Sequence, residues 1–291
     1  MRALIQNYIN GESTEAGYIT EALNRAGANA ELWTDGMSAY DKMDVFKPNV
    51  VFCHYMFLTG DIIRYLSNSQ IDIVINISGI QQHELDTIVN EIKDKNINCP
   101  FLFSNLPREA IKVKADGVKI HSIMNAADIF LTATEDFKDF EIDLGVVCDY
   151  DATSKFSEQT ADIRSWHFLS TSPDMENSDI LAPIQQMPSL YGRYKKLIVT
   201  VDGPRIPQHF FDAVIHGNDV SFESKYGTQD KVSQSVITKL LGEDNTTWKS
   251  HVEKKHTCLN RVDKILSLLG VKDLAKNIGK ASDDNSITQW V

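Results

Sequence analysis

A short segment between an expected strand and an expected helix carries the residue types that bind a phosphorylated ligand. The apolar run 196–201 predicts the strand, and Gly203 begins the turn that follows it. Pro207 is typical of the first turn of a helix, where unpaired N–H groups favour an anion. Arg205 adds a charged fork that suits a diphosphate, and Asp212 could accept hydrogen bonds from a ribose. The alternative interpretation is that Arg205 and Asp212 are solvated charges beside a buried helix face.

Three other side chains have the residue type of a general base. His54 and Glu15 follow expected strands, and His83 lies shortly after a third. Each could take a proton from a hydroxyl group held near the ends of those strands. In the alternative interpretation the histidines are satisfied polar residues, and Glu15 complements the positive end of a helix.

The elements that must position these residues follow an α/β pattern in the first half of the chain. Helices are expected near residues 16–26, 60–67 and 82–93. Strands are expected at residues 3–8, 30–33, 50–55, 71–77 and 101–104. Short continuous apolar strands separated by helices are typical of a parallel sheet covered on both faces. The first half is therefore expected to be a Rossmann-like domain.

The second half repeats this style after an acidic stretch near residue 138. Strands are expected at residues 144–148, 166–170, 196–201 and 219–222, with helices near 189–191 and 208–216 and mostly helix from about 231 onward. We expect two Rossmann-like domains, 1–138 and 139–291, facing across a cleft, with the last helix packing back on the N-terminal domain. Ligands of open parallel sheets bind beyond the carboxyl ends of the strands, so the cleft is the expected site.

Composition excludes several classes of protein. The 291 residues are 42% hydrophobic and carry a formal charge of −11, which excludes a disordered chain and a general grip on nucleic acid. No apolar run approaches the roughly 18 residues of a membrane span, and the start is too polar for a signal peptide, so a cytoplasmic protein is expected. The four cysteines lie far apart, and Asp149-Tyr150-Asp151 resembles a metal-binding motif only loosely. No essential metal is expected.

The negative charge is unevenly distributed. Between Lys249 and Lys280 eight basic residues stand against three acidic ones, which gives that segment +5 and the remainder −16. The simpler interpretation is a solvated helix face. The other is that Lys254, Lys255 and Lys264 guide a polyanionic acceptor.

Three ordered segments resemble motifs of the GT-B glycosyltransferases, of the CgeB-like and group 1 type. Residues 207–217 resemble Pro-x-Arg-x-Phe-Glu-Ala-x-x-x-Gly, residues 189–199 resemble Leu-Tyr-x-x-x-Lys-x-x-Leu, and residues 256–266 resemble His-Thr-Tyr-x-x-Arg-x-x-x-Leu. A weaker likeness covers residues 11–27, which resemble the glycine-containing start of the family's N-terminal domain.

The resemblance implies transfer of a sugar from a nucleotide-sugar donor, UDP-linked and without a further cofactor, to an acceptor hydroxyl. The C-terminal domain would hold the donor and the N-terminal domain the acceptor. His209 and Asp212 take the places of the family's arginine and glutamate, beside the diphosphate and the ribose. A histidine lacks the guanidinium fork, so Arg205 is the expected substitute. The expected donor-binding residues are Gly203, Arg205, His209, Asp212 and Tyr191, and the base candidates are His54, His83 and Glu15.

The resemblance leaves the acceptor open. It is either a cell-envelope or small-molecule glycan, or a hydroxymethylated base in bacteriophage DNA, and DNA would be bound through Lys254, Lys255 and Lys264. A different class of function is a non-catalytic GT-B-like module that recognises a sugar or a partner. His209 in place of the motif arginine favours that reading.

Overall fold

A computed structural model describes residues 1–6, 14–33, 36–129, 142–147, 166–170, 180–181, 187–201, 203–224 and 231–283. Among these residues, no helix combines the length and the apolar character needed to cross a membrane. The chain divides into two compact units: unit 1 joins Met1–Met124 to Cys258–Asn285, and unit 2 contains Asn125–Thr257.

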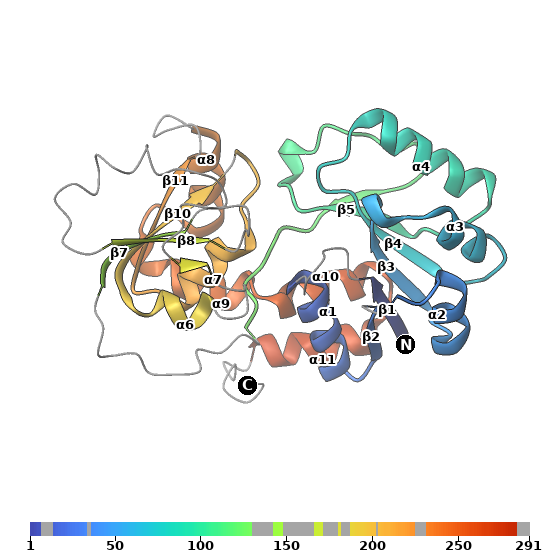
Figure 1. The fold of residues 1–291 in the computed structure, drawn as a ribbon, viewed down its shortest axis with the longest axis horizontal. Coiled ribbons are helices and arrows are strands. Elements are labelled where there is room, and N and C mark those ends of the chain that lie inside the picture. Colours follow the sequence, from blue (N-terminus) through green and yellow to red (C-terminus); the bar gives the residue numbers. More distant parts are fainter. Residues whose placement is uncertain are drawn as a thin grey trace. The chain divides into compact units, whose positions relative to one another are not determined.

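Unit 1 is built on a six-stranded sheet with the order β2-β1-β3-β4-β5-β6, in which every pair is parallel (Figure 1). Its strands are β1 (Arg2–Gln6), β2 (Asn29–Trp33), β3 (Val50–His54), β4 (Asp72–Asn76), β5 (Phe101–Ser104) and β6 (Ile120–Ser122). The connections contain α1 (Thr14–Arg25), α2 (Ala39–Phe46), α3 (Gly60–Ser67) and α4 (Gln82–Asp94), with the 3-10 turns η1 (Tyr55–Phe57) and η2 (Arg108–Ala110).

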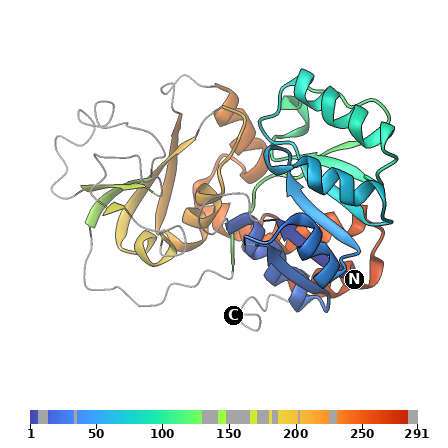
Figure 2. The same cartoon turned by 45° about the vertical axis from the view of Figure 1, so that its right-hand side comes forward.

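Helices cover both faces of this sheet, which is why its central strands β3, β4 and β5 are mostly buried and apolar. Alternate residues of a strand point to opposite faces. Leu4, Val51 and Ile73 share one core with apolar residues of α2, α3 and α4. Their neighbours in the sequence, such as Ala3 and Val50, are buried as well. Figures 1 and 2 show α1 on the face opposite α3 and α4.

The last two described helices belong to unit 1. They are α10 (Cys258–Leu268) and α11 (Lys272–Asp283), and they lie beside α1 (Figure 2). One face of α10 is buried, including Leu259, Val262, Ile265 and Leu266. Asn277 Nδ2 of α11 donates to the carbonyl oxygen of Ala26 at 3.1 Å.

This division differs from the predicted single boundary between residues 138 and 139, which lies outside the described residues. The structure divides after Met124 and again after Thr257. The physical reason is that α10 buries its apolar face in unit 1, although it follows the elements of unit 2 in the sequence. The sequence predicted that only the last helix would pack back on the N-terminal domain, whereas both α10 and α11 belong to unit 1.

Unit 2 contains a five-stranded parallel sheet with the order β11-β10-β7-β8-β9. Its strands are β7 (Ile142–Val147), β8 (Trp166–Ser170), β9 (Ile180–Leu181), β10 (Tyr194–Val201) and β11 (Asp219–Ser224). Its described helices are α6 (Met187–Tyr191), α7 (Gln208–His216), α8 (Lys231–Leu241) and α9 (Trp248–Lys255), with the 3-10 turn η4 (Asn245–Thr247).

Gly217 joins α7 to β11 where there is no room for a side chain. A Cβ atom there would lie 2.7 Å from the carbonyl oxygen of Ala213 and 2.7 Å from Cδ1 of Leu197. The φ angle is −83°, which any residue can adopt. Close packing of α7 on β10 therefore explains this glycine.

The predicted Rossmann-like α/β architecture is confirmed in both units, and the expected strands and helices lie within a few residues of their predicted bounds. Among the described α-helices and strands, three were not predicted: α2, β6 and β9. The two strands among them have three and two residues, too few to show a hydrophobic period.

Candidate active site

The turn between β10 and α7 forms as the sequence predicts. Gly203 adopts a φ of +60°, the left-handed region that glycine enters without steric cost. Its carbonyl oxygen accepts a hydrogen bond at 2.7 Å from Oγ of Ser233, which is fully buried in α8. The turn is therefore fixed to a second element of unit 2.

The N-terminus of α7 has the features of an anion site. Pro207 occupies the N-cap position and makes no side-chain cap, and the first turn holds no acidic residue. The leading N–H groups of a helix carry partial positive charge. Arg205 is exposed two residues before this end. Backbone N–H groups and a guanidinium fork together can hold a diphosphate.

The inner face of α7 is packed into unit 2. Phe210 contacts Phe222 of β11 and Trp248 of α9, with ring centroids 6.3 and 5.8 Å apart. Phe211 stacks on His256 at 5.6 Å. This packing fixes the axis of the helix and hence the position of its N-terminus.

His209 and Asp212 belong to this inner face, and they are 6% and 2% exposed. Asp212 Oδ1 accepts a hydrogen bond from the backbone N–H of Asp128 at 2.8 Å, and Oδ2 accepts one from Gln208 Nε2 at 3.4 Å. Burial, the largest influence, raises the pKa of Asp212 well above its usual value. In this structure the Asp212 carboxylate accepts hydrogen bonds from residues of the protein itself. Its predicted contact with a ribose stays a prediction.

The contacts around Asp212 tie the segment 125–129 to the rest of unit 2. Asn125 Nδ2 donates to the carbonyl oxygen of Ile206 at 2.9 Å. The N–H of Ala127 donates to the carbonyl oxygen of His256 at 2.8 Å, and Ala127 forms a parallel bridge with Thr257. Asp212 therefore has a structural contact that the sequence did not suggest.

Tyr191, predicted as a donor contact, lies at the end of α6 and is fully buried. Its side chain is part of the interior of unit 2. A donor contact by this residue stays a prediction.

Unit 1 contains a buried polar network around Arg261 of α10. The guanidinium donates to Tyr18 Oη at 2.5 Å, to Glu15 Oε1 at 2.7 Å and to Asn105 Oδ1 at 2.8 Å. Its carbon Cζ also lies 5.7 Å from the ring centroid of Phe103. A planar group with five donors can make all these contacts at once.

Two further residues complete the network: Asn76 at the end of β4 and Ser78 just after it. Asn76 Nδ2 donates to Glu15 Oε1 at 3.2 Å. Asn76 Oδ1 accepts from Ser78 Oγ at 2.6 Å, and Ser78 Oγ in turn accepts from the backbone N–H of Asn105 at 2.8 Å. These groups gather at the carboxyl ends of β4 and β5, the edge where parallel sheets bind ligands (Figure 1).

Sequence reasoning placed Arg261 only in the basic segment and in a motif. A usable signal was present, since Arg261 falls among Leu259, Val262, Ile265 and Leu266 at helical spacing. An arginine on the apolar face of a helix is buried with partners or not at all.

The three predicted bases lie in different surroundings. Glu15 belongs to the Arg261 network, with its side chain 14% exposed. His54 ends β3, and its Nδ1 accepts a long hydrogen bond of 3.4 Å from the N–H of Met56. His83 is exposed in the first turn of α4. The structure brings none of these histidines into the network, and all three roles stay predictions.

The lysines of the basic segment are divided between the two units. Lys254 and Lys255 are exposed at the end of α9 in unit 2, whereas Lys264 belongs to α10 in unit 1. Among the described residues no cluster of three or more histidine, cysteine or acidic side chains could hold a metal ion. The Asp149-Tyr150-Asp151 motif lies outside the described residues.

No protein-family model and no curated protein sequence matches this chain. Two solved structures resemble it over nearly the whole length of both chains. A glycosyltransferase from Rickettsia africae shares 8% identity, covers 98% of this chain and 99% of its own, and gives a TM-score of 0.58. A sucrose-phosphate synthase from Thermosynechococcus elongatus shares 10% identity, covers 96% and 97%, and gives 0.52. The chain has the GT-B fold. The two sheets described above thus belong to the two Rossmann-like domains of this fold, as the sequence predicted.

Proposed function

We propose that this GT-B chain is a glycosyltransferase that uses a nucleotide-sugar donor, bound in unit 2, and an acceptor hydroxyl, bound in unit 1. The observation that carries the proposal is the uncapped N-terminus of α7 beside the exposed Arg205, at the carboxyl end of β10 in a GT-B fold. A diphosphate fits that site by charge and by hydrogen bonding.

In the proposed reaction the oxygen of the acceptor hydroxyl attacks the anomeric carbon of the sugar. The bond from that carbon to the diphosphate breaks, and its electron pair leaves with the nucleoside diphosphate. The hydroxyl proton passes to a base. Arg205 and the first N–H groups of α7 stabilise the negative charge that grows on the departing diphosphate.

His209 has a supporting role in this proposal. Because it is 6% exposed, it cannot replace the guanidinium fork of the family's arginine at the surface of the site. It helps to hold the first turn of α7 in place, and Arg205 supplies the charge. A UDP-linked donor is the form of the substrate that the motif resemblance suggests.

Glu15 is the base candidate best placed for the acceptor. Its two hydrogen bonds, from Arg261 and from Asn76, both fall on Oε1. Among the described residues Oε2 receives no hydrogen bond, so that oxygen can accept a proton at the carboxyl edge of the sheet. Positioning by Arg261 would hold the carboxylate toward the acceptor.

The first test is the substitution Arg205→Ala. We expect UDP to bind about 10 to 100 times more weakly, because a charge-assisted hydrogen bond is worth about 1.5 to 3 kcal/mol. Isothermal titration calorimetry with UDP, and with other nucleoside diphosphates, measures the effect.

Lys196→Ala is the matched control, since Lys196 is an exposed cation on β10 of the same unit. It should bind UDP like the unchanged protein. Equal affinities for Arg205→Ala and the unchanged protein would remove Arg205 from the donor site.

The second candidate function is a non-catalytic GT-B module. The burial of His209 at the motif position is the observation in its favour. Such a module would bind a sugar or nucleotide without releasing UDP from a UDP-sugar. Measuring UDP release with and without candidate acceptors separates the two functions.

A DNA acceptor, the more specific option from the sequence, has weaker support. Its three lysines are divided between two units, and Lys264 Nζ already donates to the carbonyl oxygen of Ser122 at 2.6 Å.

A further inference from the structure

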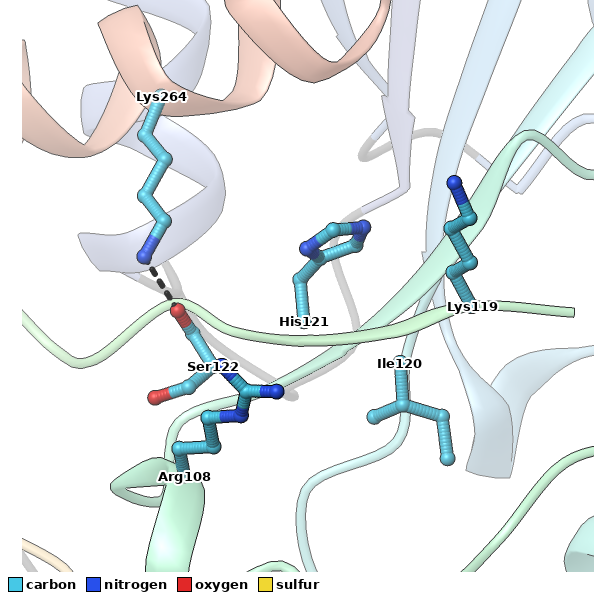
Figure 3. A pocket seen from close by; sticks show the side chains of 6 residues that line it. All are labelled: Arg108, Lys119, Ile120, His121, Ser122 and Lys264. Atoms are coloured by element: carbon cyan, nitrogen blue, oxygen red, sulfur yellow. Dashed lines mark hydrogen bonds between the residues drawn. The ribbon is translucent and has the colours of Figure 1, made fainter.

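A pocket with a basic lining lies at the edge strand of unit 1. Its cavity of about 540 Å³ is lined by Arg108, Lys119, Ile120, His121, Ser122 and Lys264 (Figure 3). None of these residues is acidic. The volume lies within the range of pockets that hold small organic ligands.

Three elements contribute the charges. Arg108 comes from η2, Lys119 directly precedes β6, and Lys264 comes from α10. Lys264 Nζ donates to the carbonyl oxygen of Ser122 at 2.6 Å, which holds the lysine against β6. Arg108 and Lys119 are exposed and form no ion pair with an acidic side chain in the described part of the chain.

His121 lies among these cations. Figure 3 shows its ring between Lys264 and Lys119. The ring forms a T-shaped pair with Phe101, with centroids 5.5 Å apart. Burial lowers the pKa of His121, and the charges of Lys264, Lys119 and Arg108 lower it further. All three cations therefore lie close enough to His121 to lower its pKa.

Positive charges that converge without an acidic partner repel one another. Backbone carbonyl oxygens, such as that of Ser122, satisfy donors but add no negative charge. A dianion would offset the positive charge and also accept hydrogen bonds from the cations. The tetrahedral arrangement of oxygens in such an anion suits donors that approach from several elements.

We propose that this pocket binds the phosphate group of a phosphorylated small molecule. A long polyanion fits less well, because the chain as a whole carries −11 and a single phosphate needs only local cations. Ile120 supplies an apolar wall for the organic part of the ligand.

If the proposed glycosyltransferase function holds, on which this extension rests, the ligand is the acceptor. The phosphate serves as a handle and stays unchanged, while a hydroxyl elsewhere on the molecule receives the sugar. Unit 1 thereby selects acceptors that carry a phosphate.

The first test follows the His121 ring protons by NMR during a pH titration, with and without sodium sulfate. Sulfate keeps a double negative charge throughout the titration of histidine. A bound dianion favours the charged imidazole, so the pKa of His121 should rise when sulfate is added. The exposed His83 serves as the internal reference for the general effect of the salt. Equal shifts for both histidines would overturn the proposal.

The second test compares inorganic phosphate, glucose 6-phosphate and glucose by calorimetry. We expect glucose 6-phosphate to bind more tightly than inorganic phosphate and glucose to give no binding. Lys119→Ala and Arg108→Ala should each weaken glucose 6-phosphate binding about tenfold. Lys112→Ala removes an exposed cation from the same connection outside the pocket and should leave the affinity unchanged.

Equal loss in Lys112→Ala and Lys119→Ala would overturn the proposal, because general charge would then explain the binding. Equal affinity for inorganic phosphate and glucose 6-phosphate would overturn the small-molecule part. Displacement by a short DNA duplex at lower concentration than glucose 6-phosphate would favour a nucleic acid instead. None of these readouts uses the sugar donor, so UDP binding at Arg205 can fail or succeed independently.

Discussion

Arg261 contacts side chains up to 246 residues away from it in the sequence. Its side chain is 2% exposed, and its guanidinium contacts a carboxylate, a phenol and an amide at the carboxyl edge of the first sheet. A buried charge of this kind is tolerated only while its partners remain. The network therefore links α10 to α1 and to the end of β5, and it orients the Glu15 side chain.

Arg261→Ala should lower the free energy of unfolding by about 3 to 5 kcal/mol, because Glu15 then loses its countercharge in a mostly buried site. Glu15→Gln combined with Arg261→Ala should cost less than the two single changes added together. Urea denaturation measures all three variants. The control is Arg64→Ala, whose ion pair with Asp61 is exposed and should contribute within about 0.5 kcal/mol. Strict additivity of the two buried changes would argue against a coupled network.

At the scale of elements, the two ends of α7 carry opposite partial charges and favour different groups. Its N-terminus has no side-chain cap and favours an anion, whereas its last turn carries His216. A helix C-terminus favours a charged histidine. Burial, followed by the charge of Lys249, outweighs that effect and lowers the pKa of His216 from 6.5 to about 4. The folded protein therefore keeps His216 neutral at a pH where the unfolded chain protonates it.

The sign of the pH dependence follows from this difference. Above about pH 6.5 both states are neutral at His216, and stability is complete. As the pH falls toward about 4 the unfolded state binds the proton first, so the protein loses about 2 to 3 kcal/mol through this group. His216→Gln should make the decline between these values shallower in urea titrations at several pH values. Val45→Ala, an exposed substitution that changes no titratable group, should leave the decline unchanged.

More of the fold than of the candidate site could be predicted from the sequence, and the reasons are physical. Buried strand segments, such as most of β3 and the part of β10 from Leu197 to Val201, are mostly apolar, and amphipathic helices such as α3 have a clear period. The turn at Gly203 and the open end of α7 follow from local chemistry and were predicted. The basic pocket was not predicted, because its cations come from η2, from the residue before β6 and from α10. Only tertiary structure brings such residues together.

At the scale of the whole molecule, unit 1 depends on two separated stretches of sequence. Helix α10 fills one side of α1, and α11 packs on α10. The residues Met1–Met124 alone therefore lack part of their core and one charge partner of Glu15.

A chain that ends at Thr257 should lose the stability of unit 1 and keep that of unit 2. Hydrogen exchange followed by mass spectrometry should show faster exchange in α1 and unchanged protection in β10. The full chain with Lys272→Ala, an exposed substitution at the start of α11, serves as the control. Unchanged protection of α1 in the truncated chain would mean that α10 is not needed for unit 1.

The return of the chain to unit 1 also sets an order for folding on the ribosome. Domains usually fold from the N-terminus as they emerge. Here the ribosome has made all of Asn125–Thr257 before the first residue of α10 exists. The unit that begins first is thus completed last, and the nascent chain must keep the α1 surface from aggregating while unit 2 is synthesised.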